Sequence, residues 1–301
     1  MTTSKDIELK LELADDFYKH GKHLHAIQIY HSLLDENPDL IDAYLGLASS
    51  YVEIQNPDAA MNIIDSCLEL HPDELDIRLY YIPFLLKHSK WEKIIDILSY
   101  ISPQDEPQIL FYLGYANYML EEYEIAKLNF LGFISLQNDT ALLNEAYLYL
   151  VKIDLQLGNF KSALTFSRKA EKIYSNYWEL NFLNAKIYSA LGMETHAKTS
   201  IEKAIKLNPR EPLLFEFAGN IYFKLSDYLN AEKYFSKYIE QTDNASSDVY
   251  TNLAEACLRI EKLKKASEYF DAAIKLDPGN RKAIDRRKHL DTVKKKETSD
   301  G

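Results

Sequence analysis

The chain has 301 residues, and its 47% hydrophobic content excludes a disordered protein. Its 46 acidic residues outnumber the 35 Lys and Arg, and the net charge of −11 argues against a dominant nucleic-acid-binding surface. Gly and Pro number only 9 each, whereas a β-sandwich or a doubly wound sheet needs many tight turns, so the composition favours an all-α fold.

The two cysteines, Cys67 and Cys257, are far apart and belong to no CxxC pair, so the sequence predicts neither a disulfide framework nor a zinc site. The first twenty residues carry acids where a signal peptide needs an apolar core. No run approaches 18 consecutive apolar residues, the length that a membrane span needs. We therefore expect a soluble, cytoplasmic protein without a membrane span or a cofactor.

A small residue recurs along the chain at spacings of 34, 34, 32, 37, 34, 34 and 35 residues. The recurring positions are Ala26, Ala60, Ile94 (which fills one gap), Ala126, Ala163, Ala197, Ala231 and Ala266. Twelve residues before each of these lies a second position that is usually small: Ala14, Ala48, Ile82, Gly114, Val151, Ala185, Gly219 and Ala254. Because small residues let two helix axes approach closely, each repeat is predicted to be a helical hairpin.

The apolar residues of the first repeat support this prediction. Phe17 and Tyr18 follow Leu13 and Ala14 at steps of four, and Ala26, Tyr30 and Leu33 follow one another at steps of four and three, the spacing of one helix face. Prolines mark several helix boundaries, because the residue before Pro is steered out of the α region. Such boundaries are expected at Asn37-Pro38, His71-Pro72, Asn208-Pro209 and Asp277-Pro278, and Asn56-Pro57 has the composition of a helix start.

The period and strings such as LGYANYMLEEYEIAKLNF (113–130) and NLAEACLRIEKLKKASEYFDAAIKLDP (252–278) make the chain resemble tetratricopeptide-repeat proteins. The resemblance implies an all-α fold, an α-solenoid in which about eight helix-turn-helix repeats form a right-handed superhelix. The expected repeats are 7–40, 41–74, 75–106, 107–143, 144–177, 178–211, 212–246 and 247–280. Because they occupy nearly the whole chain, no separate catalytic domain is expected.

The third repeat, 75–106, departs most from the pattern. Ile82 and Ile94 replace both small residues, and Pro83 falls inside the first helix, where it removes a backbone hydrogen bond. An irregular joint is therefore expected near 83–107. A second irregularity is expected at 137–140, where the longest spacing adds three residues.

Segment 281–296 is charged apart from a thin apolar stripe that includes Ala283 and Leu290. A repeat stack ends in an exposed apolar face, so this segment is predicted to be a capping helix. Residues 1–6 and 297–301 are expected to be disordered.

A search for catalytic motifs finds no GxGxxG, GxxxxGK[ST], HExxH or GxSxG, so we expect a protein that is not an enzyme. His20, His23, His25 and His31 are close in sequence, but no further His or Cys stands at a spacing that completes a metal site. They are interpreted as turn residues in contact with solvent, and no metal site is predicted.

The family resemblance implies that the first helix of each repeat lines the inner surface, where ligands commonly bind. The residues so placed are mostly apolar, and a long apolar surface of this kind marks a partner site. The expected groove residues are Leu79, Phe111, Tyr115, Tyr118, Leu148, Phe182 and Phe223. The alternative is that these side chains pack under neighbouring repeats. Acidic residues near the start of most first helices favour a basic, amphipathic partner.

Some family members bind the terminal carboxylate of a chaperone tail through Lys, Arg and Asn side chains, the groups that carboxylates require. The resemblance carries this clamp onto Asn220, Asn252, Lys282 and Arg286, but Glu216 replaces the first Lys of the pattern.

The sequence thus predicts a non-catalytic scaffold or adaptor that holds an apolar or amphipathic protein segment in its groove. Two alternatives stay open. One is a chaperone-associated adaptor that binds an acidic C-terminal peptide through the 212–286 end. The other is a regulatory or assembly subunit of an enzyme or membrane complex, with peripheral membrane contact through the basic C-terminal helix. The sequence does not determine the oligomeric state.

Overall fold

The computed structural model describes the backbone of residues 4–136, 140–172 and 176–299, and it leaves out the side chains of 140–141 and 293–299. Within these ranges the chain forms 17 helices and no strand. The helices form two compact units, residues 1–122 and 123–301. The all-α prediction is confirmed.

The first unit contains α1 (Ser4–Lys19), α2 (His23–Glu36), α3 (Ile41–Glu53), α4 (Pro57–Leu70), α5 (Leu75–Lys87), α6 (Trp91–Leu98) and α7 (Gln108–Met119). The second contains α8 (Tyr123–Leu136), α9 (Thr140–Gln156), α10 (Phe160–Glu171), α11 (Trp178–Ala190), α12 (Glu194–Leu207), α13 (Pro212–Lys224), α14 (Tyr228–Gln241), α15 (Ser247–Arg259), α16 (Leu263–Leu276) and α17 (Arg281–Ser299).

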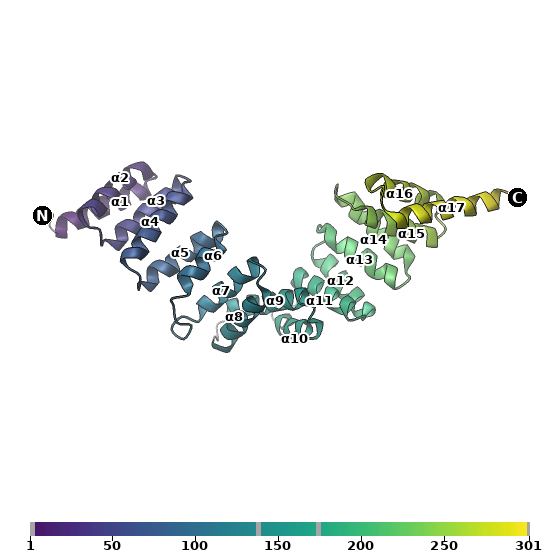
Figure 1. Cartoon of the computed structure of the whole chain (residues 1–301), viewed down its shortest axis with the longest axis horizontal. Helices are drawn as coiled ribbons and strands as arrows, with labels where there is room; N and C mark the ends of the chain where they lie inside the picture. The colour runs from purple at the N-terminus through teal and green to yellow at the C-terminus, as the bar shows by residue number, and fades with distance from the viewer. Residues whose placement is uncertain (1–3, 137–139, 173–175, 300–301) are drawn as a thin grey trace. The chain divides into compact units, whose positions relative to one another are not determined.

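Within each unit, each helix packs against the next one along the chain, and first helices also contact one another, as α1 contacts α3 and α13 contacts α15. Figure 1 shows these consecutive helix pairs inside each unit. This arrangement of stacked helix pairs is that of an α-solenoid, as the sequence predicts.

The recurring small positions explain why the pairs pack closely. Every Ala among them is buried, and so are Gly114, Gly219 and the larger substitutes Ile82, Ile94 and Val151. At Gly219, an added Cβ would lie 2.6 Å from the ring of Phe235 on the partner helix α14. The axes of α13 and α14 are therefore as close as a glycine allows.

One residue in the left-handed region ends the first helix of each of the eight pairs, a feature that sequence analysis missed. These residues are Gly21, Gln55, Ser89, Glu121, Gly158, Gly192, Ser226 and Glu261, with φ between 54° and 72°. The next residue closes the turn by donating a backbone hydrogen bond to the carbonyl five positions back, as Lys262 does to Cys257 at 2.9 Å. Only three of the eight are glycines, so at the other five the turn is held against a cost of about 1–2 kcal/mol per residue.

The irregular segment of the third pair lies at 99–107, in the later part of the expected range 83–107. Helix α5 continues through Pro83, whereas α6 has only eight residues and is followed by a nonhelical segment to 107. Buried Arg78 secures this segment, because its guanidinium donates to the carbonyls of Pro72 and Ile97 and lies 5.1 Å over the Tyr100 ring.

Three boundaries differ from the expected ones. Helix α1 begins at Ser4, within the segment 1–6 expected to be disordered, and Asp6 in its first turn favours the helical start. Helix α17 continues to Ser299, past the expected end at 296. The units divide after Glu122, inside the expected repeat 107–143, although the turn there has the same left-handed residue as the others. Residues 1–3, 137–139 and 300–301, also covered by these expectations, lie outside the described chain.

The close crossing at Gly219 can be tested by Gly219→Ala. Helix propensity alone favours Ala by about 0.8–1.0 kcal/mol, whereas the contact with Phe235 requires the ring to move and costs about 1–3 kcal/mol. We expect net destabilisation in urea unfolding, and we expect Phe235→Leu to remove part of it in a double-mutant cycle. A variant more stable than the wild type would contradict the close crossing.

Candidate functional site

The first unit contains an apolar pocket of about 440 Å³ beside helices α3, α4 and α5. Its lining comes mostly from these three helices, with one residue from α1. The lining residues are Tyr18, Ala48, Ser49, Val52, Glu53, Ala60, Ile64, Tyr80, Tyr81, Pro83, Phe84 and Lys87. Most of these side chains are apolar or aromatic, so the pocket suits an apolar group.

Polar groups are confined to a few positions of the lining. The hydroxyls of Ser49 and Tyr80 form a hydrogen bond of 2.5 Å. Burial, followed by the charge of Glu53 and the neighbouring Tyr80, raises the pKa of Tyr18, so this hydroxyl is protonated at neutral pH. Glu53 and Lys87 are exposed and place one charge of each sign in the lining.

In the second unit, the first helices α9, α11 and α13 carry a row of aromatic and charged side chains, which are half-buried except for the exposed Lys186. The Lys152 ammonium lies 2.7 Å from the Glu179 carboxylate, which also accepts a hydrogen bond of 2.7 Å from the Tyr177 hydroxyl. The Lys186 ammonium lies 4.4 Å from the centre of the Phe182 ring, and this ring contacts Phe217 edge-on at 5.5 Å. We call Lys152, Glu179, Phe182, Lys186 and Phe217 the aromatic row.

Burial and neighbouring charges act in opposite directions on the pKa values of Glu179 and Lys186. Burial tends to raise the pKa of Glu179, but hydrogen bonds from Lys152 and Tyr177 and the charges of Lys152 and Lys186 lower it overall. Burial lowers the pKa of Lys186, although Glu179 opposes this. The row therefore presents paired charges beside aromatic rings, a surface that can contact an amphipathic segment.

The expected groove residues fall in both units, and their burial differs. Leu79, Tyr115, Tyr118, Phe182 and Phe223 are half-buried, which leaves part of each side chain accessible. Phe111 is 5% exposed and Leu148 8%, so the expectation that these two form an open surface is corrected. Leu148 packs in a core cluster with Ala170 and Leu180. Phe182 stands at the same repeat position as both and is half-buried, so the burial of Phe111 and Leu148 reflects their own neighbours.

The structure brings together the residues of the expected carboxylate clamp. Asn252 donates to the amide oxygen of Asn220 at 3.5 Å, and the Lys282 ammonium donates to the amide oxygen of Asn252 at 3.0 Å. Arg286 instead pairs with Glu255, which is buried, at 2.6 Å. Three of the four residues are therefore joined by hydrogen bonds, while Arg286 forms an ion pair with Glu255.

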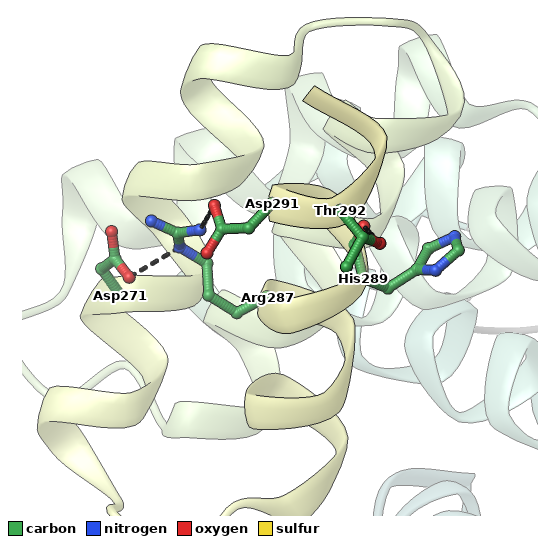
Figure 2. Close-up of polar contacts among 5 residues, drawn as sticks. All are labelled: Asp271, Arg287, His289, Asp291 and Thr292. Atoms are coloured by element: carbon green, nitrogen blue, oxygen red, sulfur yellow. Dashed lines mark hydrogen bonds and ion pairs between the residues drawn. The ribbon is translucent and has the colours of Figure 1, made fainter. Parts of the chain in front are cut away.

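Helix α17 is held on the second unit by its own basic side chains. Figure 2 shows Arg287 between Asp271 of α16 and Asp291 of α17, and its Nε lies 2.8 Å from the Asp271 carboxylate. Ala283 and Leu290 of the predicted apolar stripe are fully buried. The helix covers α16 at the end of the unit, as a cap does. Its Arg286 and Arg287 pair with carboxylates of the same unit and not with a membrane or nucleic acid.

The histidines near the first turn make aromatic contacts. His25 stacks on Phe17 and His23 meets Tyr18 edge-on, with ring centres 5.4 and 5.3 Å apart. In the part of the chain that the structure describes, no three His, Cys, Asp or Glu side chains are grouped as metal ligands. The same part contains no helix that is both long and apolar enough to cross a membrane.

The cysteines are buried in the two cores and are not bonded to each other. Burial raises the pKa of both Cys67 and Cys257 to about 11. Neither thiol is therefore an activated nucleophile at neutral pH.

Sequence reasoning missed the pocket of the first unit as a site. Tyr80, Tyr81 and Phe84 lie in the third repeat, of which only Leu79 was expected to contact a partner. The available signal was a cluster of three aromatic residues around Pro83, within two turns of helix.

Family models described as Tetratricopeptide repeat match residues 17–82, 179–211, 215–244 and 247–280. Human Tetratricopeptide repeat protein 6 is 25% identical over 218 residues, which cover 71% of this chain but only 35% of the human protein.

Two solved structures have the same fold at 18% identity. YrrB, described as a TPR protein with an unusual peptide-binding site, matches with a TM-score of 0.54 over 66% of this chain and 97% of its own. A chain of the APC/C hetero-tetramer Cut9-Hcn1 matches with a TM-score of 0.53, over 95% of this chain and 56% of its own length.

The role of Arg286 in holding α17 can be tested by Arg286→Ala. Loss of the guanidinium leaves the buried Glu255 without its cation, and we expect unfolding in urea to become easier by about 1–3 kcal/mol. Lys288→Ala, a change at an exposed position of the same helix, is the control and should change stability by less than about 0.5 kcal/mol. Equal stabilities of the two variants would show that the pair does not anchor the cap.

Proposed function

Because the chain belongs to the tetratricopeptide-repeat family, whose domains are generally protein–protein interaction modules, we propose that it is a non-catalytic scaffold that binds a partner segment. The segment contacts the first helices and carries apolar side chains on one face and charged ones on the other. Tetratricopeptide repeats are usually non-catalytic, which agrees with a scaffold.

The observation that carries this proposal is the aromatic row of the second unit. Phe182 remains half-buried although it packs edge-on against Phe217, so part of its ring is available to a ligand. Lys152 and Glu179 beside it can exchange their mutual ion pair for contacts with charges on the partner. Aromatic residues in such positions supply most of the binding energy in many interfaces.

The proposal can be tested by selecting random 12-residue peptides from a display library on the full chain. We expect enrichment of peptides that alternate apolar and charged residues at helical or extended spacing. Phe182→Glu should lower the affinity for the enriched peptides by at least about tenfold, as measured by fluorescence anisotropy, because it removes the partly exposed ring and adds a charge.

Leu229→Glu is the matched control, since it adds the same charge at a residue of α14 that is 62% exposed. It should leave the affinity unchanged, and circular dichroism should confirm that both variants are folded. If no peptide is enriched, or if Phe182→Glu binds as the wild type does, the scaffold proposal fails for this surface.

The second candidate function, a chaperone-associated adaptor, has one specific observation in its favour. Asn220, Asn252 and Lys282 are already hydrogen-bonded in a line, so amide and ammonium donors converge near one place. Glu216, in the position of a cation, and the engagement of Arg286 by Glu255 oppose it. The structure favours the regulatory or membrane-associated alternative less, because Arg286 and Arg287 are paired within the unit.

The clamp can be tested with an acidic peptide that ends in a free carboxylate and with the same peptide amidated at its C-terminus. If the clamp operates, amidation weakens binding by about tenfold or more, and Asn252→Ala has a similar effect on the free-acid peptide only. Asn230→Ala, on α14, is the control. Equal binding of the two peptides would rule out the clamp and leave the scaffold proposal untouched.

A further inference from the structure

We propose that the pocket of the first unit receives an aromatic side chain that a basic partner segment presents. This inference rests on the proposed function, because it assigns a specific anchor to a partner segment. It concerns a different unit and different residues from the aromatic row.

The size and walls of the pocket favour an aromatic group. A volume of about 440 Å³ lies within the range of about 300–1,000 Å³ that is typical of ligand pockets, and it exceeds what one aliphatic side chain fills. Tyr81 and Phe84 stack with ring centres 5.9 Å apart and 17° between their planes. A third ring can meet this pair edge-on, the arrangement that aromatic groups prefer.

Small and irregular residues leave this space open. Ala48 and Ala60 belong to the small positions of the second pair, so their side chains take up little of the volume. Pro83 is exposed and lines the pocket from α5. The other first helices of this unit carry no proline at the equivalent position, so the pocket depends on the irregular third repeat.

Hydroxyl groups of the lining supply acceptors for the partner. Ser49 and Tyr80, which are hydrogen-bonded to each other, place two hydroxyl oxygens there. A ring that carries an N–H or O–H, or the backbone N–H next to it, can satisfy one of these groups.

The negative charge of the first unit favours basic residues on either side of the partner's aromatic group. Residues 1–122 contain 22 Asp and Glu against 8 Lys and Arg, whereas residues 123–301 contain 24 against 27. The first unit thus carries a net charge of −14, and exposed Glu53 places a carboxylate in the lining itself. Lys87 is the opposing charge there, but it does not offset the field of the unit, so a basic segment is attracted and an acidic one repelled.

The test uses the full chain and four fluorescein-labelled nonapeptides, measured by anisotropy at two salt concentrations. The first has a central Trp flanked by two Lys on each side, the second has Ala for the Trp, the third has Leu for the Trp, and the fourth has Glu for the Lys. We expect the Trp peptide to bind at least about tenfold more tightly than the Ala and Glu peptides and more tightly than the Leu peptide.

Two variants connect the preference to the pocket. Val52→Trp fills the volume from a half-buried lining position and should abolish the difference between the Trp and Ala peptides. Tyr80→Ala removes a wall at a residue that is 46% exposed, so it tests the same point if Val52→Trp does not fold. Glu53→Lys should lower the affinity for the Trp peptide more than Glu69→Lys does. Glu69→Lys is the control, because it makes the same charge change at an exposed residue of α4 outside the pocket.

Three results would overturn the inference: equal binding of the Trp and Ala peptides, an unchanged preference in both pocket variants, or equal effects of Glu53→Lys and Glu69→Lys. Free N-acetyltryptophanamide that binds as tightly as the Trp peptide would assign the pocket to a small molecule instead. Phe182→Glu, which tests the scaffold proposal in the second unit, should leave the Trp preference unchanged, so the two proposals fail separately.

Discussion

The fold depends on the close crossing of two helices at a small residue. No helix pair of this chain can bury its apolar face alone, and stacking hides it only if neighbouring axes approach closely enough for side chains to interdigitate. The buried alanines at both recurring positions and the contact of Gly219 with Phe235 show how little space is available. The same constraint makes the terminal helix α17 necessary, because the last pair would otherwise expose this face.

The repeat period was readable from the sequence because it is carried by residue size, which is local and repeats with the structure. The left-handed turn residues recur with the same period, but five of the eight are Gln, Ser or Glu, so composition does not mark them. There the hydrogen bond that closes the turn, as from Lys262 to Cys257, holds a conformation that the residue itself disfavours. Tertiary packing sets such a feature, and single-residue preference does not reveal it.

The candidate sites were predictable only in part, for two physical reasons. The predicted register is right, yet residues at the same repeat position differ in burial: Phe182 is half-buried, whereas Phe111 and Leu148 are buried. Burial depends on the side chains packed around each residue, which the repeat period does not specify. The contact between Asn220 and Asn252 joins consecutive first helices, so the stacking of the repeats brings these two amides together. The pocket beside Pro83 lies in the repeat that departs most from the pattern, so the pattern does not predict its geometry.

The distribution of charge gives the two units different chemistry on one fold. The acidic side chains of the first unit are in large excess, so its surface field selects partners by sign before any side chain is in contact. In the second unit the charges nearly balance, and many are paired: Lys152 with Glu179, Arg286 with Glu255 and Arg287 with Asp271. Such pairs hold helices together and contribute little long-range field. The field of the first unit thus acts on charged molecules at a distance, whereas the paired charges of the second unit act at short range.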